Sequence, residues 1–505
     1  MKLTATLARM LLVVSLVAAS TAAWADAVPS KQLPRSDPEA QGIPSKAVQA
    51  FVEAAEAKID AVHSVMVVRH GRVVAEGWWT PYGKNDPHVM YSLSKSFTST
   101  AVGLAIADGK LTLDDSVVAA FPEDAPATVS DNLKAMRLRD LLRMNTGQHA
   151  DDVSAFHFDG DDKLTRVFLS LPVAHKPGTH FWYNTPATYM ASAMVQKATG
   201  QTVLDYLRPR LFDPLGIENP TWDASQQGIT LGGFGLRIKT EDIARFGQLY
   251  LQKGEWQGKR LVPADWIAEA TARQTSNGSS PTSDWEQGYG YQFWRCRHGL
   301  YRGDGAFGQF CIVMEKQDAV VAITSGTRDL AGVMNLVWEH ILPALDAKPL
   351  PADKASVTKL RQKLAGLTLP PQAGEAMKPL AAQVSGKRYV FPANEAKLEA
   401  VVVEFGPDGA VIRLRQNGKD TRIPAGRAWQ RGETLLTLGV PEKVAGTGAW
   451  TADDTFTAKL AAYETPFVQT VAFQWKGEEL RVDTEYNVAF GERKRPQLVG
   501  KLESK

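Results

Sequence analysis

The sequence contains little cysteine, no large excess of charge and no long apolar run, and each absence excludes a class of protein. Only 2 of the 505 residues are cysteine, which excludes a disulfide-rich scaffold and a four-cysteine zinc site. The 57 basic and 55 acidic residues give a formal net charge of +2, so we expect no nucleic-acid partner. No stretch approaches 18 uninterrupted apolar residues, so stable membrane insertion is not expected. Nothing in the sequence identifies a protein partner.

The first 25 residues have the features of a secretory signal peptide. Lys2 and Arg9 precede a short apolar run, and Ala23-Trp24-Ala25 forms a small-x-small cleavage site. The run is too short to span a bilayer. We therefore expect cleavage after Ala25 and a secreted protein, most simply one exported to a bacterial periplasm.

Small and apolar residues fill the stretch from Ser92 to Gly109, which predicts a helix buried on all sides. Ser92 and Lys95 lie at its start, and their spacing places both side chains on one helix face. A desolvated lysine can lose its proton and then act as the base that activates a serine hydroxyl. The N-terminal end of the helix adds unpaired N–H groups and a positive field. The pattern predicts a nucleophile, Ser92, and its base, Lys95.

The same spacing occurs a second time, because Ser-x-x-Lys is a short motif of common residues. Ser356-Val357-Thr358-Lys359 lies in a polar segment that follows Pro349-Leu350-Pro351. We interpret this second copy as a solvated helix face.

Two further segments are candidates for the same site. Tyr183 follows the turn Pro177-Gly178-Thr179 and is either a core ring with a satisfied hydroxyl or the group that protonates a leaving group. The glycines of Gly303 to Gly308 allow close approach to a ligand carbonyl, although an ordinary bulge or hairpin turn explains them equally well.

The two cysteines, Cys296 and Cys311, lie in strand-like runs on either side of a glycine-rich turn. A disulfide across this hairpin and two separate buried thiols are both compatible with the sequence. Two sulfurs with only His298 nearby do not favour a metal site.

The order of the predicted elements indicates an α+β domain followed by an all-β domain. A helix over 46–59 and a hairpin over 65–76 precede the buried helix. We then expect helices and strands over the following ranges: helices 187–198, 240–252 and 263–272, and strands 288–294 and 303–314. The predicted boundaries are a signal peptide over 1–25, an α+β domain over 26–345, a linker over 346–378 and a β-sandwich or barrel over 379–505.

With these residues in place, the chain resembles the penicillin-recognising serine hydrolases over about residues 34–345. This family includes class C β-lactamases, DD-peptidases, related esterases and 6-aminohexanoate-dimer hydrolases. Ser92-Leu93-Ser94-Lys95 matches the first motif of the family, Tyr183 the second, and Gly303-Asp304-Gly305 the third. The resemblance implies an antiparallel sheet flanked by helices, with an additional helical lobe.

The chain departs from the family pattern at two motifs. The second motif is normally Tyr-x-Asn, whereas here Tyr183-Asn184-Thr185 leaves the asparagine role to Asn184 or to no residue. The third normally begins with Lys or His, whereas here Gly303 occupies that position. Because that cation usually binds a substrate carboxylate, its loss favours a neutral ester or amide.

The resemblance also implies a mechanism that uses neither a metal nor a cofactor. Ser92 attacks a carbonyl, Lys95 and Tyr183 transfer the proton, and the backbone N–H groups of Ser92 and Ala306 hold the oxyanion. Asn184, Gly303, Asp304 and Gly305 would contact the substrate. Two other functions remain open: a β-lactamase or DD-peptidase acting on carboxylated substrates, and a non-catalytic binding or scaffolding protein. The absence of Gly-x-Ser-x-Gly argues against an α/β-hydrolase.

Overall fold

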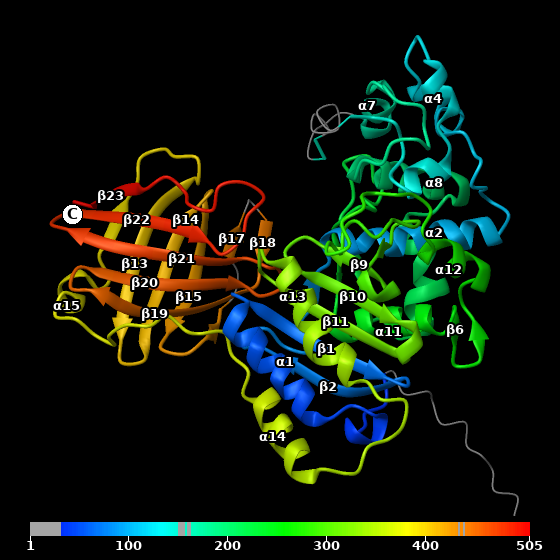
Figure 1. Ribbon diagram of the computed structural model, residues 1–505. Coiled ribbons are helices and arrows are strands. Elements are labelled where there is room, and N and C mark those ends of the chain that lie inside the picture. The colour runs from blue at the N-terminus through cyan, green and yellow to red at the C-terminus, as the bar shows by residue number, and fades with distance from the viewer. Residues whose placement is uncertain (1–31, 150–156, 159–162, 433–434, 438–439, 505) are drawn as a thin grey trace, which may run out of the picture.

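The computed structural model describes residues 32–149, 157–158, 163–432, 435–437 and 440–504 (Figure 1). The predicted signal peptide lies outside the described residues. Within them, no helix combines the length and the apolar composition needed to cross a membrane. Figure 1 shows a mixed helix and sheet domain beside an all-β domain, which confirms the predicted fold class.

A six-stranded antiparallel sheet forms the centre of the first domain. Its strands lie in the order β2 (Arg72–Trp78), β1 (Val62–Arg69), β11 (Ala319–Ser325), β10 (Gln309–Met314), β9 (Tyr301–Gly305) and β8 (Trp294–Arg295). The predicted hairpin is β1 and β2, and its two turn residues, His70 and Gly71, have φ angles of 49° and 69°. Two consecutive residues with positive φ are typical of the tight turn that matches the twist of paired strands.

Helices cover both faces of this sheet (Figure 1). Strand β1 is buried along its whole length, with Met66 and Val68 in one core and Val65 and Val67 in the other. This double burial explains why the strand has a nearly continuous apolar sequence. The first core includes α2 (Ser94–Ala107), α8 (Thr185–Thr199), α11 (Thr240–Leu251) and α12 (Ala264–Thr271), and the second includes α1 (Ser45–Lys58) and α13 (Leu330–Leu336).

The remaining helices and strands of the first domain are short. The helices are α3 (Val117–Ala120), α4 (Asp131–Ala135), α5 (Leu138–Leu142), α7 (Leu164–Ser170), α9 (Val203–Leu207) and α10 (Asp213–Leu215). The strands are β3 (His88–Val89), β4 (Thr221–Trp222), β5 (Leu236–Ile238), β6 (Glu255–Trp256) and β7 (Lys259–Arg260).

Two strand predictions near the site were wrong in their extent. The expected strand over 288–294 contributes only Trp294 to β8, and the expected strand over 303–314 is split between β9 and β10. The split occurs because Phe307 and Gly308, with φ angles of 66° and 93°, form a tight turn between two antiparallel strands. The hairpin-turn alternative for the glycines of 303–308 is therefore confirmed.

The two cysteines are separate buried thiols, so the disulfide alternative is wrong. Cys311 belongs to the core on the α11 side of the sheet, whereas Cys296 belongs to the core on the opposite side. Burial raises the pKa of both thiols. Their position on opposite faces of the sheet keeps them apart.

The segment between the domains is ordered against the first domain. It contains α14 (Lys354–Ala365), and Leu360 and Leu367 are buried in the same core as α1. The second domain begins with α15 (Ala381–Val384) and forms a ten-stranded sheet in the order β15-β14-β13-β12-β23-β22-β21-β20-β19-β16. An additional pairing of β15 with β19 closes it into a barrel-like shape.

The barrel strands are antiparallel neighbours except for the parallel pairing of β15 with β19. Their bounds are β12 (Arg388–Val390), β13 (Leu398–Gly406), β14 (Gly409–Gln416), β15 (Lys419–Gly426), β16 (Gln430–Arg431), β19 (Val444–Ala452), β20 (Thr455–Ala462), β21 (Val468–Lys476), β22 (Glu479–Tyr486) and β23 (Leu498–Leu502). A separate short pair consists of β17 (Leu435–Thr437) and β18 (Val440–Glu442).

Candidate active site

Ser92 lies in a single helical turn, Tyr91–Leu93, that leads directly into α2. Strand β9 packs tightly against this turn. A side chain at Gly303 would overlap Leu93 and Ser96, and one at Gly305 would overlap the carbonyl of Met90. These glycines therefore have a packing role, and substrate contact by their backbone stays a prediction.

Lys95 is 1% exposed and its amino group has polar partners on three sides. Its Nζ lies 3.0 Å from Ser92 Oγ, 3.2 Å from Thr185 Oγ1 and 2.8 Å from the carbonyl oxygen of Gly233. Burial lowers the pKa of Lys95 to about 7, and the nearby charge of Asp304 opposes this shift. A substantial fraction of the lysine is therefore neutral at physiological pH, as a general base requires.

Tyr183 lies beside the same pair of residues. A hydrogen bond joins its hydroxyl to Ser92, and Lys95 Nζ lies 5.0 Å from the centroid of its ring. The ring stacks on Trp294 with centroids 5.2 Å apart. Burial, followed by the charge of Asp304, raises the pKa of Tyr183, while the hydrogen bond from Ser92 lowers it. The tyrosine is therefore held in its protonated form, ready to give a proton to a leaving group.

Asn184 is a capping residue of α8 rather than an open polar group. Its Oδ1 accepts a hydrogen bond from the backbone N–H of Ala187, and its Nδ2 donates to Thr146 and Gln148. The side chain is fully buried. This arrangement does not favour the substrate-binding role that we expected of Asn184, because its amide already has protein partners on both ends.

Thr185 instead occupies the position beside Lys95. Thr185 was not among the predicted site residues, because the family motif has an asparagine at this position, two residues after the tyrosine. The carbonyl of Gly233 was also missed. The pair Gly232-Gly233 was a usable signal, because a side chain at Gly233 would overlap Thr185.

Asp304 forms a buried ion pair with Arg302. Both Nε and one terminal nitrogen of Arg302 donate to the same Asp304 oxygen, at 3.0 and 2.7 Å. The guanidinium also lies 4.8 Å from the ring centroid of Trp285 and 5.7 Å from that of Trp294. The charge of Asp304 acts on both Lys95 and Tyr183, so a carboxylate lies near them on the strand where the family pattern has a cation.

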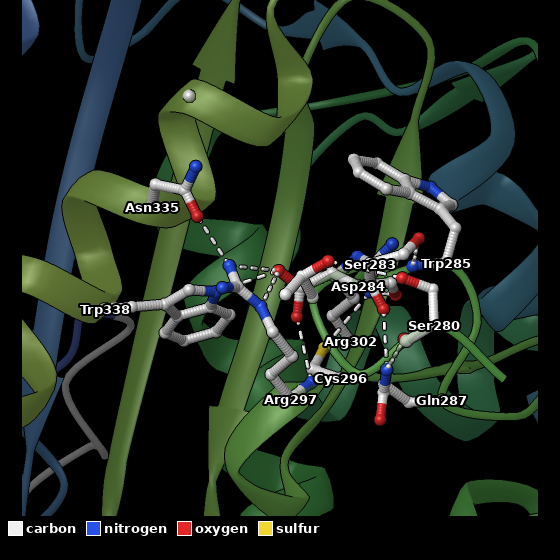
Figure 2. A network of polar contacts seen from close by, with 12 residues as sticks. Ser280, Ser283, Asp284, Trp285, Gln287, Cys296, Arg297, Arg302, Asn335 and Trp338 are labelled. Carbon is white, nitrogen blue, oxygen red and sulfur yellow. Dashed lines mark hydrogen bonds and ion pairs between the residues drawn. The ribbon is translucent and has the colours of Figure 1, made fainter.

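Arg302 also belongs to a larger polar network (Figure 2). Another nitrogen of Arg302 donates to the backbone carbonyl of Asp284 and to Cys296 Sγ. The Asp284 carboxylate accepts in turn from Arg297 and Trp338. Because each buried polar group here has partners, the network fixes the position of the Arg302–Asp304 pair. Within the described residues, no group of three or more His, Cys, Asp or Glu side chains is arranged to hold a metal ion.

Comparisons with known proteins identify the family and the fold. The Beta-lactamase family model matches residues 48–346. The 6-aminohexanoate-dimer hydrolase of Paenarthrobacter ureafaciens is 25% identical over 307 residues, which are 56% of this chain and 78% of that protein. Lovastatin esterase of Penicillium rubens is 24% identical over 174 residues, covering 29% of this chain and 42% of the esterase.

A solved structure supports the fold. A Bacillus anthracis protein provisionally named 6-aminohexanoate-dimer hydrolase superposes with a TM-score of 0.52 at 18% identity, covering 64% of this chain and 89% of that chain. The resemblance inferred from the three motifs is thereby confirmed at the level of family and fold.

Proposed function

The chain belongs to the Beta-lactamase family, among whose members are amide and ester hydrolases, and we propose that it is an exported serine hydrolase. It would cleave an ester or amide bond through a covalent acyl-enzyme on Ser92. The observation that carries this proposal is the 3.0 Å contact between Ser92 Oγ and the amino group of a fully buried lysine. That lysine has a pKa of about 7 and can accept the serine proton near neutral pH.

In the acylation step, Ser92 Oγ attacks the substrate carbonyl carbon while its proton passes to neutral Lys95. The carbonyl oxygen becomes an oxyanion, held by the backbone N–H groups of Ser92 and Ala306. The tight packing of β9 on the Ser92 turn supports this assignment, because Ala306 directly follows β9. Tyr183 then protonates the leaving oxygen or nitrogen and recovers a proton from Lys95.

In deacylation, a water molecule takes the place of the departed group. Lys95, neutral again after acylation, accepts one of its protons as it attacks the acyl carbon, and later returns a proton to Ser92. The second tetrahedral intermediate collapses, Ser92 regains its proton, and the free acid leaves. No residue beyond those already placed at the site is needed to balance these steps.

A neutral ester or amide is the favoured substrate. The Asp304 carboxylate lies close enough to raise the pKa of both Lys95 and Tyr183. A negatively charged group on this side of the site disfavours an anionic substrate, although Arg302 compensates part of the charge. A side chain at Gly303 would overlap the side chains of Leu93 and Ser96, so a cation at this position would require both to move. Penicillins and D-Ala-D-Ala peptides carry carboxylates and are therefore the second choice.

The test is hydrolysis of three substrates by the mature chain from Asp26 onward. We expect turnover of p-nitrophenyl butyrate or a linear amide, no turnover of the β-lactam nitrocefin, and loss of all turnover in Ser92→Ala. Nitrocefin turnover would instead favour a β-lactamase. The absence of a covalent fluorophosphonate adduct on Ser92 would favour a non-catalytic scaffold. Expression of the full-length gene in a bacterium, followed by fractionation and N-terminal sequencing, tests export and cleavage after Ala25.

A further inference from the structure

An aromatic wall adjoins the Ser92 turn and is shared between the two domains. We use this name for Tyr91, Phe307, Phe467 and Phe490. Tyr91 and Phe307 belong to the first domain, whereas Phe467 and Phe490 belong to the barrel. Tyr91 directly precedes Ser92, and Phe307 directly follows Ala306. The wall therefore begins beside the nucleophile and beside the proposed oxyanion donor.

The four rings contact one another closely. The centroid of Tyr91 lies 5.7 Å from that of Phe307 and 5.4 Å from that of Phe490. Phe307 lies 4.7 Å from Phe490 and 5.8 Å from Phe467. Most of the pairs are edge-to-face or tilted, the geometries that aromatic rings prefer.

Specific hydrogen bonds hold the barrel against the first domain at this point. The turn between β20 and β21 accepts a hydrogen bond from the backbone of Val89 to Glu464 and another from the Tyr82 hydroxyl to Thr465. The Nδ2 of Asn487 donates to the carbonyl of Gly326 at 2.8 Å. In Figure 1 the end of β20 and the start of β21 point toward the first domain. Phe467 and Phe490 are therefore fixed beside the site.

Phe490 is exposed although it packs on two rings. It is 73% exposed, whereas Phe307 and Phe467 are each 8% exposed. Large apolar side chains with this exposure are few among the described residues, and another of them, Trp182, is 42% exposed directly beside Tyr183. Phe490 therefore presents an exposed apolar face on the wall that begins beside Ser92, where an apolar group of a ligand can cover it.

We propose that the aromatic wall binds the acyl group of the substrate and that Phe490 of the barrel determines acyl-chain specificity. This proposal rests on the proposed serine hydrolase function. The leaving group must lie against its proton donor, Tyr183, which packs in a different cluster with Trp294 and Tyr289. The wall beside Tyr91 is then available to the acyl group. The favoured substrate class is an ester or amide of a medium-chain aliphatic or an aromatic acid.

The first test compares p-nitrophenyl octanoate with p-nitrophenyl acetate, which share a leaving group. In Phe490→Ala, we expect the ratio of kcat/KM for octanoate to that for acetate to fall about tenfold, because the longer acyl chain loses an apolar contact. Phe490→Leu should keep most of the ratio. The matched control is Met377→Ala, which removes another exposed apolar side chain, 47% exposed, and should leave the ratio unchanged.

A second test needs no turnover. Isothermal titration of the full mature chain with 2-decanone and 2-butanone compares a long and a short uncleavable ketone. We expect Phe490→Ala to weaken 2-decanone binding about tenfold. An unchanged chain-length preference in both tests would overturn the acyl subsite. Activity that survives Ser92→Ala would instead overturn the Ser92 mechanism, while the titration still decides whether the wall binds acyl chains.

Discussion

Two segments of the chain have the same Ser-x-x-Lys spacing but different surroundings. At the start of α2, Lys95 is 1% exposed and its amino group contacts Ser92 Oγ. In α14, Lys359 is exposed, and the Ser356 hydroxyl donates to the Asp353 carboxylate at 2.7 Å, as part of the helix cap. The spacing alone therefore does not make a nucleophile. Desolvation of the lysine and direct contact with the serine distinguish the two copies.

The largest predicted difference between the copies is the effect of removing each serine. Ser92→Ala should lower kcat on the order of 10⁴-fold or more, because the acyl-enzyme can no longer form. Ser356→Ala should leave kcat unchanged and lower stability slightly through the lost contact with Asp353. Steady-state hydrolysis of p-nitrophenyl butyrate measures the first effect, and thermal unfolding measures the second.

Covalent labelling also distinguishes Ser92 from Ser356. After treatment with a fluorophosphonate, peptide mass spectrometry should find the adduct on Ser92 and none on Ser356. Labelling of Ser356, or equal activity in the two variants, would remove the distinction between the copies.

The second prediction concerns the two lysines. Lys95→Met should lower kcat/KM about 10²- to 10⁴-fold through loss of the general base, whereas Lys359→Met should have no effect. In the wild type, kcat/KM should rise as the pH increases through about 7, because Lys95 must lose its proton to act as a base. A flat profile between pH 6 and 8, with intact folding by circular dichroism, would show that another group is the base.

The sequence predicted the helix of α2 and the two reacting side chains at its start because local patterns determine them. Spacing places Ser92 and Lys95 on one face, and the small apolar residues of α2 imply its burial. Long-range packing determines the parts that were missed. Thr185 and Gly233 reach Lys95 across 90 and 138 residues of sequence, and no local period encodes such contacts.

Local patterns and long-range packing divide the fold in the same way. The β1–β2 hairpin was predicted from its turn, whereas the β9–β10 turn was only one of the alternatives for the glycines of 303–308, because its first turn residue with positive φ, Phe307, is aromatic. The side of the sheet that each cysteine faces depends on strand register, which the sequence around Cys296 and Cys311 does not determine.

The third prediction concerns the pH dependence of stability. Because the pKa of folded Lys95 is about 7 and that of an unfolded lysine is about 10.4, the unfolded chain binds more protons between these values. The free energy of unfolding should therefore rise between pH 7 and 10, and Lys95 should contribute at most about 1.4 kcal/mol per pH unit to this rise. Urea unfolding at several pH values should show that Lys95→Met loses this contribution and that Lys359→Met keeps it. An equal dependence of the unfolding free energy on pH in both variants would contradict the low pKa of Lys95.

The smallest predicted difference lies between the two threonines that accompany the motifs. Thr185→Val removes an acceptor 3.2 Å from Lys95 Nζ and should lower kcat about tenfold, because the amino group loses one of the contacts that orient it toward Ser92. Thr358→Val, in α14, removes a hydroxyl that donates to the carbonyl of Lys354 and should leave kcat unchanged.

Thr185→Asn introduces the residue that the family motif has two positions after its tyrosine, and its amide oxygen can accept from Lys95 again. Recovery of kcat in Thr185→Asn but not in Thr185→Val would identify the accepted hydrogen bond, rather than side-chain volume, as the contribution of this position. Equal losses in both variants would show instead that packing around Thr185 is what matters.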